Sequence, residues 1–281
     1  SLEDAQALAK KKDQHILFFA SDTLSADFKK TVLDSNDFLR TAKKHYTLLN
    51  IEYDTSAEFP PDLQKISLDY NIQFDKSLYI LSYEGYILGI IPYTPTFVSG
   101  ADVRDAILAF EKNPPPTLSL LQTIRKTDDP QKKVLLIDSF FEASDETIRR
   151  PLVPLCRSVL LLDKENTSGL LGKYELFLAN NEAESLLQQK NVEAAANLFT
   201  DLCTSGHLDV HQQFLAYYEA AYIHTLAHDI QYNAVLDLLQ KAYDRLGKEN
   251  AAKEITEVEK TMELVRALHS LDSAYQGEDK N

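Results

Sequence analysis

The sequence predicts an α/β domain followed by an all-α domain. In the first 113 residues, short apolar runs alternate with amphipathic segments, which is typical of strands and helices that share one α/β domain. Three successive prolines at residues 114–116 cannot continue a helix and favour an extended linker. Residues 117–281 contain segments of helical length and apolar spacing, without a strand run bounded by turn residues.

The elements of the first domain follow in a clear order. A helix over residues 2–12 precedes an apolar strand at 15–20, and a short polar helix leads on to a second strand at 46–54. Residues 78–89 read as a hairpin with a glycine-containing turn. A helix over 103–110, with apolar side chains on one face, closes the domain.

Residues 21–25 read Ser-Asp-Thr-Leu-Ser, and a polar helix and residues 32–38, Val-Leu-Asp-Ser-Asn-Asp-Phe, follow them. This pattern resembles the bacterial thioredoxin-like domains, whose signature is a strand, Ser-Asp-Trp-Cys-x-x-Cys, a helix and Val-Leu-x-x-Pro-Glu-Phe. The resemblance implies a thioredoxin-like fold for residues 1–113. Counted back from Val32, the two family cysteines fall on Asp22 and Ser25, and neither is a thiol. A helix-capping role explains these two residue types.

The second half of the family's redox site also differs. In the family, a cis-proline precedes a hairpin of the form Asp-x-x-Gly-Lys-x-x-Gly, and that proline position falls on Lys76 here. A cis bond before a non-proline residue costs roughly 2.5–4 kcal/mol. We therefore expect a trans bond before Lys76, a rearranged loop at residues 73–77, and a degenerate domain that lacks thiol–disulfide exchange.

Residues 117–281 predict an all-helical domain that is tetratricopeptide-like. Residues 191–199 resemble residues 231–239, and setting Ala195 against Ala234 gives a period of 39 residues. A plain helical bundle is the alternative. Predicted helices cover residues 118–124, 130–141, 151–162, 169–189, 191–203, 209–228, 230–246 and 251–271.

Three tyrosines, Tyr217, Tyr218 and Tyr222, lie on neighbouring turns of one predicted helix. A stripe at helical spacing usually faces the core, but tyrosine is also enriched at recognition surfaces, and helical arrays bind partners on a concave side. These three residues are the candidate partner-binding residues.

Two histidine pairs, 207 with 211 and 224 with 228, stand at i and i+4, the spacing that places two imidazoles on one helix face. No glutamate follows the first histidine as in the His-Glu-x-x-His zinc motif. We expect no metal site, with His224 and His228 as weak candidates. A chain with 8 glycines and no Gly-rich phosphate loop also predicts no cofactor.

The two cysteines, Cys156 and Cys203, lie in apolar helical contexts outside the first domain. We interpret both cysteines as small, buried apolar residues, and a structural disulfide between them is the alternative.

Composition narrows the class of partner. No apolar run approaches 18 residues, which predicts no transmembrane helix. The net charge of −14 argues against nucleic acid and anionic membranes, which attract clustered Lys and Arg. The chain begins at Ser1, without an initiator Met. Together with the family resemblance, this leads us to expect an exported, periplasmic protein, with the cytoplasm as the alternative.

These observations predict a non-catalytic thioredoxin-like adaptor that acts through protein–protein or peptide contacts. The alternative is a redox-related enzyme or chaperone that uses Cys156 and Cys203 or a site that the sequence does not reveal.

The first prediction is that the chain does not reduce insulin at a thioredoxin's rate under dithiothreitol coupling, because exchange requires a thiolate and residues 1–113 contain no cysteine. Introducing Asp22→Cys with Ser25→Cys should create a reducible pair with poor turnover, since Lys76 cannot supply the cis-proline. Thioredoxin-like turnover by the unaltered chain would contradict the prediction.

Overall fold

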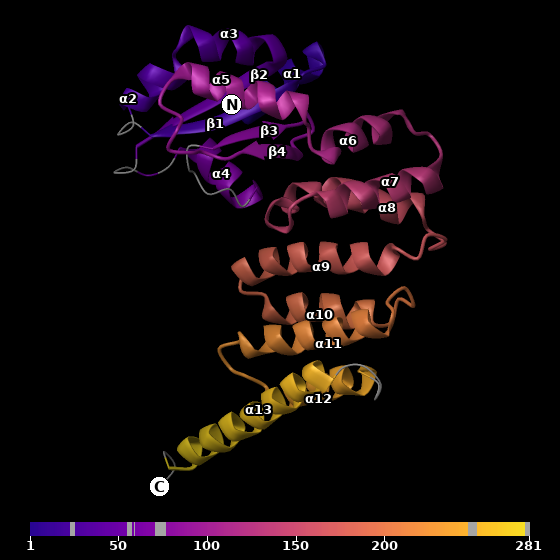
Figure 1. Cartoon of the computed structure of the whole chain (residues 1–281). Helices are drawn as coiled ribbons and strands as arrows, with labels where there is room; N and C mark the ends of the chain where they lie inside the picture. The colour runs from indigo at the N-terminus through magenta and orange to yellow at the C-terminus, as the bar shows by residue number, and fades with distance from the viewer. Residues whose placement is uncertain (23–25, 55–57, 59, 71–76, 247–251, 279–281) are drawn as a thin grey trace. The chain divides into compact units, whose positions relative to one another are not determined.

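The computed structural model describes residues 1–22, 26–54, 58, 60–70, 77–246 and 252–278. Its backbone confirms the predicted fold class, a thioredoxin-like α/β part followed by helices (Figure 1). The strands are β1 (His15–Asp22), β2 (Tyr46–Tyr53), β3 (Leu78–Leu81) and β4 (Ile87–Ile91). The helices among and after them are α1 (Leu2–Lys12), α2 (Ala26–Phe28), a π-helical turn at Lys29–Leu33, α3 (Asn36–His45), α4 (Pro61–Tyr70) and α5 (Gly100–Lys112).

The four strands form one mixed sheet in the order β2-β1-β3-β4. Strand β1 pairs in parallel with β2 from His15↔Tyr46 onward, and antiparallel with β3. Strands β3 and β4 form the predicted hairpin, whose turn contains Gly85 at a φ of 94°. The left-handed region suits glycine because it carries no Cβ.

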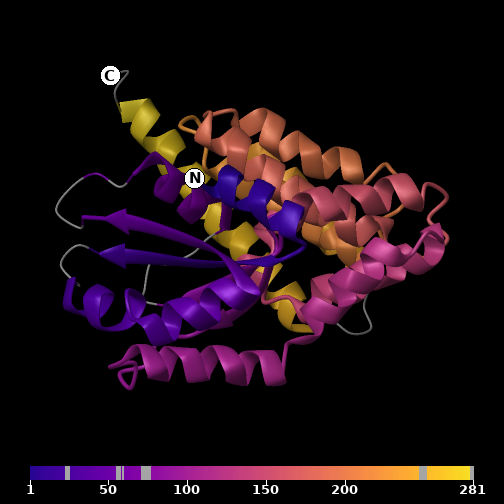
Figure 2. The same ribbon diagram turned by 90° about the horizontal axis from the view of Figure 1, so that it is seen from above.

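Strand β1 is the centre of the first core because both of its faces are covered. Phe18 and its neighbours at alternate positions pack into a cluster with side chains of α1 and α4. On the other face, the ring of Phe19 meets Phe38 of α3 edge-on at 5.7 Å. Helices α3 and α5 pack against each other on that side (Figure 2). Burial on both faces explains why β1 reads as a continuous apolar run rather than an alternating one.

The prolines at residues 114–116 join two helices that pack within one compact unit. Helix α6 (Pro116–Lys126) begins at the third proline, and the Thr117 hydroxyl donates to the carbonyl of Leu88 in β4 at 2.5 Å. The chain divides into compact units at Ser1–Leu155 and Cys156–Asn281. This division lies later than the predicted domain ranges, 1–113 and 117–281, because α6 is tied to the β3–β4 hairpin.

The rest of the described chain is helical. Helix α7 (Pro130–Ala143) has a proline at its first turn, as predicted, and two short 3-10 turns, Glu146–Ile148 and Arg150–Leu152, follow it. The remaining helices are α8 (Val153–Leu162), α9 (Leu171–Gln188), α10 (Val192–Leu202), α11 (Val210–Thr225), α12 (Tyr232–Arg245) and α13 (Ala252–Glu278). Within the described ranges, no helix is long and apolar enough to cross a membrane.

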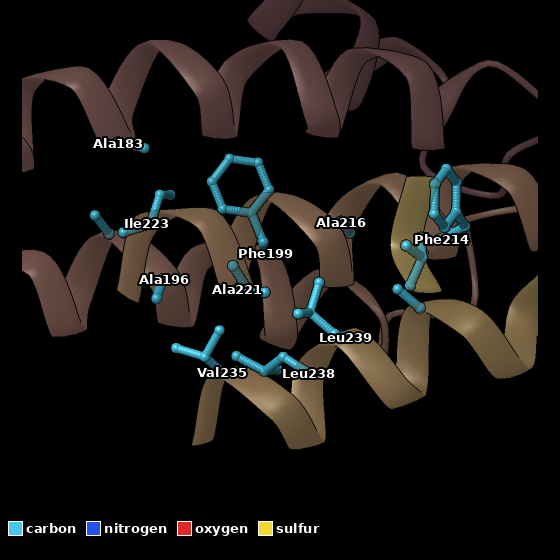
Figure 3. Close-up of a cluster of buried hydrophobic side chains, with 14 of the residues drawn as sticks. Ala183, Ala196, Phe199, Phe214, Ala216, Ala221, Ile223, Val235, Leu238 and Leu239 are labelled. Carbon is cyan, nitrogen blue, oxygen red and sulfur yellow. The ribbon is translucent and has the colours of Figure 1, made fainter. Parts of the chain in front are cut away.

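The core of the second unit is built from small residues around a few large ones. Helix α11 packs against both α10 and α12, and α12 packs against α13. Ala216, Ala220 and Ala221 of α11 are almost completely buried at these contacts. Phe199 of α10 is 1% exposed and lies among alanine and branched side chains of the neighbouring helices (Figure 3).

The second prediction concerns this core. Phe199→Ala should lower the free energy of unfolding of the helical unit by about 3–5 kcal/mol, because it removes a buried ring and leaves a cavity. Asn197→Ala, on the exposed side of the same helix, should change it by less than about 0.5 kcal/mol. Denaturant unfolding followed by circular dichroism measures both, and equal losses would contradict this account of the core.

Candidate functional site

Of the three positions that correspond to the family's redox residues, the structure describes one, Asp22. Asp22 is the last residue of β1, where its backbone is paired with Tyr53. Helix α2 begins at Ala26, so Asp22 is not the residue directly before the helix that a cap requires. Ser25 and Lys76 lie outside the described residues, and the trans bond before Lys76 stays a prediction. The described backbone contains no cis peptide bond.

Both cysteines carry free thiols. Cys156, on α8, is completely buried, and Cys203 is half-buried after the end of α10. Burial raises the pKa of the Cys203 thiol, and this outweighs the lowering by Tyr217 and Arg245. A reactive cysteine needs a lowered pKa and access to solvent. Cys156 lacks the access to solvent, and the pKa of Cys203 is raised.

The histidine pairs do not share helix faces, which corrects the sequence interpretation. His207 precedes Asp209, the N-cap of α11, and α11 ends at Thr225, before His228. The i, i+4 argument holds only while the helix continues, so the pair His224 and His228 has no common face. His207 instead places Nδ1 2.8 Å from Oε1 of Glu175 on α9. Among the described residues, no group of three or more His, Cys, Asp or Glu side chains is placed to hold a metal ion.

The three candidate tyrosines have different surroundings. Tyr217 and Tyr218 are half-buried and pack against the core of the second unit, where the Tyr218 ring lies 5.9 Å from that of Phe214. Tyr222 is 57% exposed. The helix therefore turns two of the three rings towards the core and one towards solvent.

Tyr222 belongs to an apolar stripe on α11 that the sequence analysis did not single out. Leu215 is also exposed and falls on the same side of the helix as Tyr222, and the exposed Leu226 is the C-cap that directly follows α11. Helix α13 carries a second stripe, made of Leu264, Leu268 and Leu271 at i, i+4 and i+7. We call Leu215, Tyr222 and Leu226 the α11 stripe, and the three leucines the α13 stripe.

Helices α10 and α12 differ from α11 and α13 in what they expose. The exposed side chains on these two helices are all polar or charged. They are Glu193, Asn197 and Asp201 on α10, and Asn233, Asp237, Gln240, Lys241, Asp244 and Arg245 on α12. Single exposed apolar residues are ordinary on any surface. Stripes confined to α11 and α13 are more informative, because contiguous apolar surface marks interaction sites.

A carboxylate lies within the α11 stripe. Glu219 follows Leu215 by four residues and precedes Tyr222 by three, so it shares their side of the helix. The side chain is half-buried, and burial raises the pKa of its carboxyl group. Within the described part of the chain, Glu219 has no hydrogen bond or ion pair from its carboxylate. A partly desolvated acid of this kind is stabilised by a nearby cation.

One comparison matches residues of the helical unit that include the α11 stripe and Leu264 and Leu268. A family described as an uncharacterised protein C-terminal domain matches residues 170–269. An uncharacterized protein of Treponema pallidum (strain Nichols) is 35% identical over 115 residues, which cover 40% of this chain and 37% of that protein. The chain therefore spans well under two thirds of that relative's length. A solved structure of DsbH oxidoreductase aligns with 39% of this chain and 80% of its own, at 17% identity and a TM-score of 0.33.

The third prediction concerns the thiols. Iodoacetamide should label Cys203 several-fold more slowly than glutathione at pH 7, because a raised pKa leaves less thiolate, and the rate should rise with pH. Cys156 should react only after denaturation. Variants with Cys156→Ser or Cys203→Ser assign the signal to one thiol, and rapid labelling of either native thiol at neutral pH would contradict the burial argument.

Proposed function

We propose that this chain is a non-catalytic binding protein whose helical unit holds a protein or peptide partner on the α11 and α13 stripes. The observation that carries the proposal is the distribution of exposed side chains. Large apolar residues are exposed on α11 and α13, whereas α10 and α12 expose polar residues. A segment that covers the stripes would remove apolar area from water at about 25 cal/mol per Å².

A tetratricopeptide-like arrangement of α9–α13 accounts for this alternation. Each helix packs on the next one along the chain, from α9 to α13. Contacts of Tyr232 with His269 and of Tyr243 with Glu259 make α12 and α13 antiparallel. In stacked helical hairpins, alternate helices form one layer of the array, and partners bind in the concave surface. Helices α11 and α13 would then line the binding side, and α10 and α12 the solvated back.

The chemistry of the partner follows from Glu219. An apolar segment that also carries a Lys or Arg would cover Leu215 and Tyr222 and place its cation at the half-buried carboxylate. The net charge of −14 favours the approach of such a segment over long range. We infer an amphipathic, basic peptide or helix as the partner class.

The absence of thiols from the first unit supports a role without catalysis. Cys156 is the first cysteine of the chain, and neither thiol has the environment of a redox cysteine. An enzyme or redox chaperone that uses Cys156 and Cys203 is the second candidate, and labelling tests it. We propose the periplasm as the compartment, because the sequence resembles exported thioredoxin-like proteins, with the cytoplasm as the alternative.

The fourth prediction tests the stripes with a displayed library of random 15-residue peptides selected on the intact chain. Selected peptides should combine apolar residues with Lys or Arg. Tyr222→Ala should weaken their binding by about 1–2 kcal/mol, as expected for an aromatic anchor, and should leave the melting transition nearly unchanged because Tyr222 is exposed. Leu268→Ser should act in the same direction.

Two matched variants sharpen this experiment. Lys241→Ala on α12 changes an exposed residue of the polar side and should leave affinity unchanged. Glu219→Gln should weaken the binding of peptides that carry a basic residue. It should not change the binding of peptides in which norleucine replaces that basic residue. The proposal is overturned if the selected peptides lack basic residues, or if Tyr222→Ala and Leu268→Ser leave their affinity unchanged.

A further inference from the structure

A second site lies in the first unit, at the opposite end of β1 from Asp22. A cavity of about 240 Å³ is lined by residues from the end of α1, the start of β1, the β3–β4 turn and the end of α6. The side chains that matter are Asp13, His15, Tyr83, Gln122, Arg125 and Lys126. One water molecule occupies about 30 Å³ in the liquid. The cavity therefore has room for a small molecule of several non-hydrogen atoms.

Arg125 is fixed in place on one wall. Its Nε and Nη2 donate to the two carboxylate oxygens of Glu84 at 2.9 and 2.6 Å, and its Cζ lies 4.0 Å from the centre of the Tyr83 ring. Burial pushes the pKa of Glu84 up, but the hydrogen bonds from Arg125 and Ser82 outweigh it and lower that pKa. The pair orients the guanidinium and leaves Nη1 without a hydrogen bond among the described residues.

His15 contributes an imidazole whose Nδ1 is buried and has no hydrogen-bond partner in the described part of the protein. Burial lowers the pKa of His15, Arg125 lowers it further, and Glu84 and Asp13 oppose these effects. A lowered pKa favours the neutral form of the ring. An unpaired buried N–H is rarer than an unpaired acceptor, which favours the tautomer with the proton on Nε2. That tautomer presents a donor on the accessible edge of the ring.

The polar groups that remain for a ligand are mainly donors. Lys126 and Gln122 make no hydrogen bond within the described residues through their side chains, and Nη1 of Arg125 and Nε2 of His15 add further N–H groups. Glu84 is already engaged by Arg125, so Asp13 supplies the remaining carboxylate of the lining. A ligand with two acceptor oxygens and one negative charge would complement this set.

We propose that this cavity binds a small carboxylate-bearing molecule, with Lys126, Gln122 and His15 as the groups that recognise the carboxylate. Asp13 also lines the cavity, and its carboxylate could accept an ammonium group on the same molecule, so free amino acids and simple carboxylate anions share the required chemistry. This site is independent of the helical stripes, and either proposal can fail without the other.

The test is a nuclear magnetic resonance titration of the intact, isotope-labelled chain with acetate, glycine and acetamide, read at the histidine side chains. Acetate or glycine should shift the His15 imidazole signals saturably and raise the pKa of His15, since a nearby anion favours the imidazolium. Acetamide, which has the same shape without the charge, should not. Tighter binding of glycine that Asp13→Asn abolishes would identify the amino-acid form, and equal binding of acetate would identify the simple anion.

Two lysine variants provide the matched comparison. Lys126→Gln should raise the dissociation constant at least fivefold, whereas Lys132→Gln, at an exposed position of α7, should not change it. The proposal is wrong if neither carboxylate gives a saturable shift at His15, if acetamide binds equally well, or if Lys126→Gln has no effect while its spectrum shows a native fold.

Discussion

Close packing of α11 between α10 and α12 is the constraint on which the helical unit depends. Ala216, Ala220 and Ala221 occupy the packed sides of α11 and are at most 1% exposed, so the neighbouring helices approach closely without large side chains between them. The remaining side of α11 carries Leu215 and Tyr222, which are 39% and 57% exposed. The same arrangement that stabilises the core thus leaves large apolar side chains exposed on α11, whereas the exposed side chains of α10 and α12 are polar. The proposed partner would bind on the apolar side.

The first unit has a different organisation. Its sheet is centred on β1, which is buried on both faces, and helix α6 is held to the β3–β4 hairpin by Thr117 and by the ion pair of Arg125 with Glu84. The end of β1 that would carry redox cysteines in a thioredoxin-like protein has none. The opposite end holds a cavity lined by His15, whose buried Nδ1 has no hydrogen-bond partner among the described residues, and by several side-chain donors. The proposed ligand site and Asp22 thus lie at opposite ends of β1.

Sequence patterns predicted the elements well because local signals define them. Asp209 caps α11 and Pro130 starts α7, as their residue types indicate. The histidine pairs were misjudged because i, i+4 spacing says nothing about where a helix ends. The leucines of α13 were not recognised as a surface, because the same spacing describes a buried and an exposed face, and only the packing of neighbouring helices decides between them. The hydrogen bond from Thr117 of α6 to Leu88 of β4 is also a tertiary contact, and local sequence patterns do not predict it.

The most direct test of the central claim is a structure of the intact chain bound to a peptide selected on it. The account predicts that the peptide covers the α11 and α13 stripes, buries Tyr222 and Leu268, and places a Lys or Arg side chain within hydrogen-bond distance of Glu219. A peptide bound on the polar sides of α10 and α12, or on the first unit with both stripes still exposed, would contradict it.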